Sequence, residues 1–104
     1  MVYEVVTTTV FSRWAKRLKD RIAARAIALR LARARAGNLG DTKAVGGGVS
    51  EMRIHVGKGY RIYYFRRGKT LILLLCGGDK STQAEDIERA KQLAADLPDE
   101  DDAH

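Results

Sequence analysis

The chain has a single cysteine and a single proline, and it lacks a long apolar run. With Cys76 alone no intramolecular disulfide can form, so nothing favours a disulfide-stabilised secreted domain. The longest apolar run, residues 71–76, is far shorter than the roughly 20 residues of a membrane-spanning helix. The N-terminus also lacks the charged and apolar segments of a signal peptide. We therefore expect a soluble cytoplasmic protein in which Cys76 is a small buried hydrophobe and not a nucleophile.

Acidic residues are scarce before the last quarter of the chain, and the charge is therefore uneven. The 104 residues carry 19 Lys and Arg against 13 Asp and Glu, a formal charge of +6. Residues 11–36 hold nine bases and one acid, whereas residues 81–104 hold two bases and eight acids. A body this basic favours a polyanionic partner such as nucleic acid, or an acidic protein that masks the basic surface. Charge alone does not separate these two partners.

The length fits one domain with one modest core. We assign residues 1–98 to this domain and residues 99–104 to an acidic, disordered tail. A β-branched and aromatic run predicts a first strand at 3–6. Two helices follow: the first is capped by Thr9 and carries an apolar stripe, and the second spans 20–36. The arginines of the second helix form either a solvated surface or a binding surface.

The second half of the chain changes to a period of two. We predict a flexible, glycine-containing loop at 38–48, then strands at 49–56, 60–65 and 71–76, and a last amphipathic helix at 84–97. The third of these strands is apolar at every position and should lie centrally in the sheet. The order predicts an α+β fold in which the two early helices cover one face of a mostly antiparallel sheet. The other face of the sheet would then be open for chemistry.

The first two of these strands predict a hairpin with a charged face. A three-residue loop at 57–59 places His55 opposite Arg61 and Arg53 opposite Tyr63, and it keeps apolar residues opposite apolar residues. A two-residue loop would mix charge into the core face. Adjacent cations on one face repel each other, which costs stability unless an anion compensates them. The face is either an anion-binding surface or a solvated polar surface with incidental basic residues.

These side chains suit the cleavage of RNA without a metal. Such a reaction needs a group that accepts the 2′-hydroxyl proton, cations around the phosphate, and a proton or cation for the departing 5′-oxygen. Arginine suits the phosphate because its planar fork holds two oxygens. His55 is the natural candidate for proton transfer, and Glu51 is a weaker candidate for the base. Tyr63 and Phe65 share the charged face and could stack bases.

Other chemistry finds little support in the sequence. Lys80 and Ser81 follow two glycines, but the glycine spacing of a phosphate-binding loop is missing. His55, His104 and Cys76 do not make a metal-ligand pattern. We expect no metal and no cofactor.

Several segments in combination resemble a known family of toxins. They are 48–54, 57–64, 73–83 and the helix that begins near Asp86. Together they resemble toxins of bacterial type II toxin-antitoxin modules of the RelE/HigB superfamily, specifically its phage-derived, Gp49-like addiction-module killer branch. The resemblance covers nearly all of the chain. It implies a compact RelE/ParE-like α+β fold, with two N-terminal helices packed on one face of the sheet and a C-terminal helix.

The resemblance also implies an activity and partners. Such a toxin enters the ribosomal A site, cleaves mRNA as an endoribonuclease, and is neutralised by a cognate antitoxin that often has a helix-turn-helix. Arg61 matches the arginine that relatives place at the scissile phosphate, and Lys80 matches a basic residue beyond the last strand. Relatives carry catalytic or substrate-binding basic groups on the strand of Arg53 and His55.

We therefore assign catalysis and substrate binding to two sets of residues. The candidate catalytic residues are Arg53, His55, Arg61 and Lys80. The candidate substrate-binding residues are Lys58, Tyr63, Lys43 and Gln83. Some relatives use a tyrosine or histidine in the C-terminal segment, where this chain has Asp86 and Ile87, so catalysis would fall on the sheet or be weaker.

Two other functions stay open on the sequence. The fold is also that of ParE-like inhibitors of DNA gyrase, which act by binding and not by cleaving RNA. The basic helices would also suffice for a non-enzymatic RNA-binding protein, with the hairpin cluster only an anchor. Expression of such a protein should be harmless, and its RNA affinity should fall with salt without strand scission.

Overall fold

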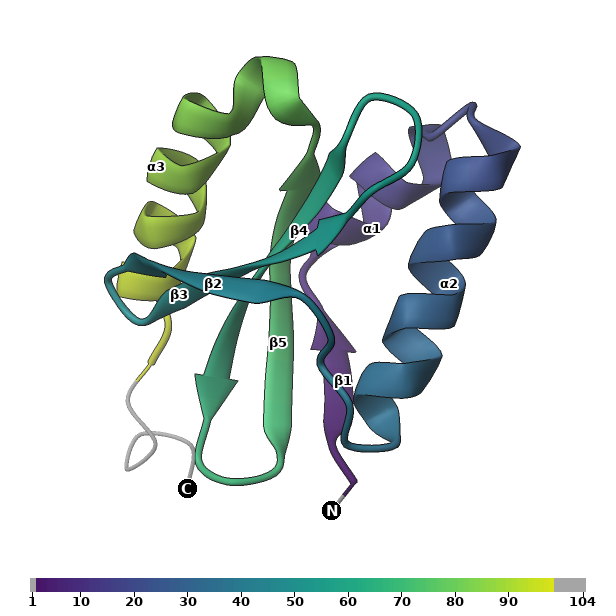
Figure 1. Cartoon of the computed structure of the whole chain (residues 1–104). Coiled ribbons are helices and arrows are strands. Elements are labelled where there is room, and N and C mark those ends of the chain that lie inside the picture. The colour runs from purple at the N-terminus through teal and green to yellow at the C-terminus, as the bar shows by residue number, and fades with distance from the viewer. Residues whose placement is uncertain (1, 99–104) are drawn as a thin grey trace.

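The structure is a computed structural model and describes residues 2–98 (Figure 1). The predicted disordered tail at 99–104 lies outside the described residues. The elements follow in the order β1 (Glu4–Thr7), α1 (Thr9–Arg17), α2 (Arg21–Arg35), β2 (Thr42–Gly46), β3 (Val49–Ile54), β4 (Tyr60–Arg67), β5 (Leu71–Gly78), a 3₁₀ turn (Lys80–Thr82) and α3 (Gln83–Ala95).

The strands form one five-stranded sheet in the order β1-β5-β4-β3-β2. The first strand pairs parallel to β5, and every other neighbouring pair is antiparallel. Figure 1 shows α1 and α2 on one side of the sheet and α3 on the other. The predicted α+β class, with a mostly antiparallel sheet, two N-terminal helices on one face and a C-terminal helix, is confirmed.

Each face of the sheet has its own core. On the first face, apolar side chains of α1 and α2, among them Phe11 and Ile27, pack on Met52 and Ile62. On the second face, α3 packs through Ala90 on a buried group of β-strand side chains, namely Val49, Tyr63, Leu75 and Cys76. The second face was expected to be open, and this expectation is wrong because α3 covers part of it.

The expected flexible loop at 38–48 contains a strand, and this is a second correction. Residues 42–46 form β2, which pairs antiparallel with β3 at the edge of the sheet, with Lys43 opposite Glu51. The edge strand is largely exposed and lacks a buried side, so it has no period-two apolar pattern. The three glycines at 46–48 all have positive φ and form the tight turn into β3.

Two side-chain caps fix where the first helices begin. Thr8, and not the expected Thr9, caps α1: its Oγ1 accepts from the Phe11 amide at 3.0 Å and donates to the Leu75 carbonyl at 2.6 Å. Asp20 caps α2 by accepting from the Ala23 amide at 3.0 Å. Thr8 therefore both caps α1 and joins the start of this helix to β5.

The two glycines that end β5 allow close packing on both faces. A Cβ at Gly77 would lie 2.4 Å from two ring carbons of Trp14, so the indole of α1 lies directly on the backbone. A Cβ at Gly78 would lie 1.9 Å from Oδ2 of Asp86 in α3. Side chains at these two positions would push α1 and α3 away from the sheet.

Candidate functional site: a cationic pocket at the β3–β4 hairpin

The β3–β4 hairpin has a longer loop than the sequence predicted. Arg53 lies directly opposite Arg61, and Ile54 lies opposite Tyr60. The loop therefore spans five residues, 55–59, and the expected pairing of His55 with Arg61 is wrong by two positions. A shift of two positions keeps every side chain on its own face, so the apolar alternation could not distinguish the two registers. The placement of Arg53, Arg61 and Tyr63 on the second face is confirmed.

Glu51 is the counter-ion of the two opposed arginines. Its side chain is buried, with Oε2 3.3 Å from Arg61 Nε and 3.9 Å from Arg53 Nε. Gln83, at the start of α3, donates from Nε2 to Glu51 Oε1 at 3.2 Å. Because both carboxylate oxygens are engaged and shielded from solvent, Glu51 compensates the cations that β3 and β4 bring together and is not placed to act as a base.

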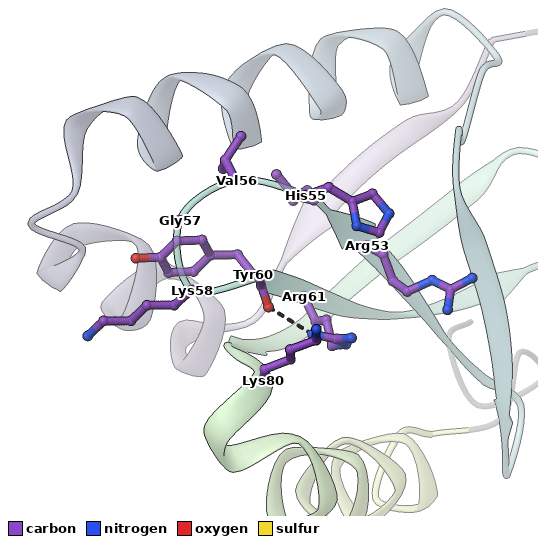
Figure 2. A pocket seen from close by; sticks show the side chains of 10 residues that line it. Arg53, His55, Val56, Gly57, Lys58, Tyr60, Arg61 and Lys80 are labelled. Carbon is purple, nitrogen blue, oxygen red and sulfur yellow. Dashed lines mark hydrogen bonds between the residues drawn. The ribbon is translucent and has the colours of Figure 1, made fainter.

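Arg61 is held firmly at the floor of the site. Only 10% of its side chain is exposed. Besides the contact with Glu51, its Nη1 donates to the Gly59 carbonyl at 2.8 Å, the dashed line in Figure 2. Among the described residues no hydrogen bond occupies Arg61 Nη2. The guanidinium is thus fixed at one end and has donors left for an anion.

A pocket of about 510 Å³ opens above this floor. It is lined by the segment from Arg53 to Arg61 and by Lys80, so four cationic side chains border it: Arg53, Lys58, Arg61 and Lys80. Figure 2 shows Lys58 on one side of the pocket and Arg53 with His55 on the other. No acidic side chain lines the pocket within the described part of the chain. The pocket therefore suits an anion.

The side chains of Lys80 and Arg61 both lie beside Gly59. A Cβ at Gly59, whose φ is +75°, would lie 3.4 Å from Lys80 Cδ and 3.6 Å from Arg61 Nη1. The Lys80 amide also donates to the Lys58 carbonyl at 3.4 Å, which ties the turn after β5 to the hairpin loop. Lys80 lies outside the hairpin in sequence, and this hydrogen bond helps to place it at the pocket that Arg61 also lines.

His55 lies at the rim of the pocket and is paired with an aspartate that the sequence reasoning missed. The His55 side chain is 73% exposed, and its Nε2 lies 2.6 Å from Asp41 Oδ2. Asp41 Oδ1 lies 3.0 Å from Arg53 Nη2. The hydrogen bond from His55, followed by that from Arg53, lowers the pKa of Asp41. Asp41 gave no sequence signal because it precedes the edge strand in a segment taken for a loop.

The four candidate substrate-binding residues have different surroundings. Lys58 lines the pocket, and Lys43 is exposed on β2. Gln83 supports Glu51. Tyr63 is fully buried against the core of α3, so the expectation that it stacks bases is wrong for this fold. Its hydroxyl lacks a hydrogen-bond partner among the described residues, and burial raises its pKa.

The chemistry of the pocket is that of anion binding beside a histidine. Arginine and lysine donors can hold a phosphate and stabilise charge that develops on it. Within residues 2–98, no three His, Cys, Asp or Glu side chains gather as metal ligands. No helix among these residues is both long and apolar enough to cross a bilayer.

Fold and site together define a small α+β protein with a cationic pocket at one end of its sheet.

Residues 10–95 match the family described as phage-derived protein Gp49-like (DUF891), and the chain belongs to this family. The family is toxin-like and related to RelE and HigB, and membership suggests a toxin of a toxin-antitoxin system with a cognate antitoxin. An uncharacterized protein of Haemophilus influenzae is 45% identical over 97 residues, which is 93% of this chain and 98% of that protein.

Proposed function

We propose that this protein is the toxin of a type II toxin-antitoxin module and that it cleaves mRNA on the ribosome without a metal ion. The observation that carries the proposal is the pocket in which Arg61, fixed by Glu51, meets Lys80, Lys58 and Arg53. A strand of RNA supplies the anion that such a pocket requires. Membership of a toxin-like family supports the choice of RNA in a translating ribosome over other polyanions.

The proposed reaction is attack by a ribose 2′-oxygen on the adjacent phosphorus. The bond from phosphorus to the 5′-oxygen breaks, which leaves a 2′,3′-cyclic phosphate and a 5′-hydroxyl end. The 2′-hydroxyl proton passes to a base, and the departing 5′-oxygen takes up a proton from water. Arg61 and Lys80 stabilise the charge on the phosphoryl oxygens while both bonds are partial.

His55 is the proton-transfer group in this proposal. When Nε2–H donates to Asp41, the other ring nitrogen, Nδ1, is an acceptor that can take the 2′-hydroxyl proton. Nδ1 has no hydrogen-bond partner within the described residues. His55 is also largely exposed, so a bound RNA strand can reach it.

The test is expression of the toxin without its antitoxin, with growth and mRNA ends followed together. Arg61→Ala should relieve growth arrest and remove the new 5′ ends. Arg66→Ala is the matched control, because Arg66 is an exposed arginine at the opposite end of the same strand. Arg61→Lys keeps the positive charge beside Glu51 but loses the planar guanidinium that can hold two phosphate oxygens. This variant should therefore also cleave mRNA less well.

Three results would contradict the proposal. If Arg61→Ala still arrested growth and still cut mRNA, the assigned centre would be wrong. Inhibition of gyrase supercoiling with intact mRNA would instead indicate a ParE-like inhibitor. Harmless expression, together with RNA affinity that falls with salt and no scission, would indicate a non-enzymatic RNA-binding protein.

A further inference from the structure

Arg30, in the middle of α2, joins three backbone segments beside the cationic pocket. Its Nη1 donates to the Arg53 carbonyl at 2.5 Å, and its Nη2 donates to the carbonyls of Leu39 and Asp41 at 3.0 and 3.2 Å. The planar fork of a guanidinium can hold such diverging acceptors at once, whereas the ammonium of a lysine cannot. This contact links α2 to the end of β3 and to the chain before β2.

The chain around Arg30 is shaped for this contact. Gly40 has a φ of +69°, and a Cβ there would lie 2.7 Å from Arg30 Nη2 and 2.9 Å from Arg30 Cζ. The Gly40 amide donates to Asn38 Oδ1 at 3.0 Å, which closes a tight turn. Only a residue without a side chain permits the guanidinium to lie this close to the backbone at Gly40.

The segment that Arg30 holds ends in the carboxylate that pairs with the site. Asp41 Oδ2 contacts His55 Nε2 at 2.6 Å and Asp41 Oδ1 contacts Arg53 Nη2 at 3.0 Å. The Arg53 amide also donates to the Asp41 carbonyl at 2.9 Å. Asp41 is thus fixed through its backbone, and its two oxygens fix one side chain each.

We propose that Arg30 and Asp41 are positioning residues for the cationic pocket: Arg30 fixes the backbone at 39–41, and Asp41 thereby orients Arg53 and His55 at the rim. Neither residue is required to touch RNA. The consequence for RNA cleavage rests on the proposed function, whereas the orientation of the two side chains does not. The charged groups that face Asp41 are Arg30 of α2, Arg53 of β3 and His55 of the hairpin loop.

Asp41→Asn separates orientation from binding and from folding. The probe for binding is a single-stranded RNA with methylated 2′-hydroxyls, which cannot be cleaved. Because the change removes a negative charge beside two basic side chains, the variant should bind this RNA as tightly as the wild type or more tightly. Its single-turnover cleavage of ribosome-bound mRNA should nevertheless fall at least about tenfold, the low end of what a mispositioned proton-transfer group costs.

A spectroscopic readout tests the orientation without any activity. In the wild type Asp41 holds the proton on His55 Nε2, so the 15N NMR shifts of the ring should report the Nε2–H tautomer, and Asp41→Asn should move them towards those of an unconstrained imidazole. Arg30→Gln should do the same, because the backbone that carries Asp41 is released. Arg33→Gln is the matched control: it makes the same charge change on the same helix, and the exposed side chain of Arg33 makes no hydrogen bond within the described residues.

The outcomes distinguish this proposal from the proposed function. If the wild type cleaves no RNA but the two variants lose the 15N signature of the Nε2–H tautomer, the positioning stands and the reaction fails. If the wild type cleaves and Asp41→Asn cleaves equally well, the positioning is wrong. A parallel loss of RNA binding, cleavage and melting temperature in Asp41→Asn would show a purely structural role and would also overturn the proposal.

Discussion

Arg61 Nε lies 3.3 Å from the buried carboxylate of Glu51, and this ion pair ties the floor of the cationic pocket to the sheet. Arg53 lies directly across from Arg61, so Glu51 faces two guanidinium groups at once. Repulsion between the two arginines would otherwise oppose the pairing of β3 with β4. The pocket can therefore keep its cations in place before an anion arrives.

The first prediction concerns the stability that Glu51 provides. Glu51→Gln keeps the shape but leaves Arg61 without its counter-charge in a place where only 10% of the side chain is exposed. We expect the free energy of unfolding to fall by about 3 kcal/mol, measured by urea denaturation. Glu88→Gln is the control, because Glu88 is largely exposed in α3 and its contact with Lys91 is 3.9 Å long. The control should change stability by less than about 0.5 kcal/mol, and an equally small change in Glu51→Gln would contradict the role of Glu51.

The second prediction concerns Lys80 as a phosphate contact. Lys80→Ala should weaken binding of 2′-O-methylated RNA of any sequence and should reduce the slope of log affinity against log salt by roughly one charge. Filter binding at several salt concentrations measures both quantities. Lys69→Ala is the matched control, since Lys69 is exposed in the β4–β5 turn at the far end of the sheet. Equal losses in the two variants would show a diffuse charge effect and no specific contact at Lys80.

The sequence predicted the fold class and one side of the site, and particular residues show why it stopped there. The alternation in β3 correctly placed Arg53 on the same face as Arg61, because parity does not depend on loop length. It could not decide between a three-residue and a five-residue loop, since both registers keep Ile54 opposite an apolar partner. The five-residue loop has a hydrogen bond of its own, from the Gly59 amide to the Val56 carbonyl at 3.0 Å, and one remote in sequence, from the Lys80 amide to the Lys58 carbonyl at 3.4 Å.

The parts of the site that the sequence reasoning missed share one cause. The role of Arg30 depends on its contacts with Gly40 and Asp41. These two residues lie in a segment without apolar periodicity, so no sequence pattern indicated the contacts. In the sequence Arg30 does not differ from the other arginines of its helix. Its role is visible only in the structure, where it contacts the chain before β2. Tyr63 shows the reverse case: its parity was right, but α3 covers that part of the face and buries the ring.

The third prediction tests the close packing of α1 on β5. Gly77→Ala would place a methyl group 2.4 Å from the Trp14 ring, so either the indole or the strand must move. We expect a loss of about 1–3 kcal/mol in the free energy of unfolding, as for other overpacked cores. In the Trp14→Leu background the same substitution should cost clearly less, because the ring is gone. A double-mutant cycle with no coupling would contradict the contact.

The fourth prediction uses the thiol of Cys76, which is confirmed as a buried residue. Burial, reinforced by the nearby Asp86 charge, raises the pKa of Cys76 to about 11. The folded state therefore holds the thiol proton at a pH where the unfolded chain releases it. The contribution of Cys76 to stability is fully present below the unfolded-state value near 9 and is lost as the pH rises towards 11.

Two measurements check this. At pH 8 a thiol reagent should label the native protein slowly and the urea-unfolded protein quickly. Between pH 9 and 11 the free energy of unfolding should fall more steeply for the wild type than for Cys76→Ala, with a difference on the order of 2 kcal/mol for a shift of this size. All other titratable groups are shared by the two proteins, so the comparison isolates Cys76. Fast labelling of the native protein, or parallel pH curves, would show that the thiol is open to solvent and that α3 does not seal this face of the sheet.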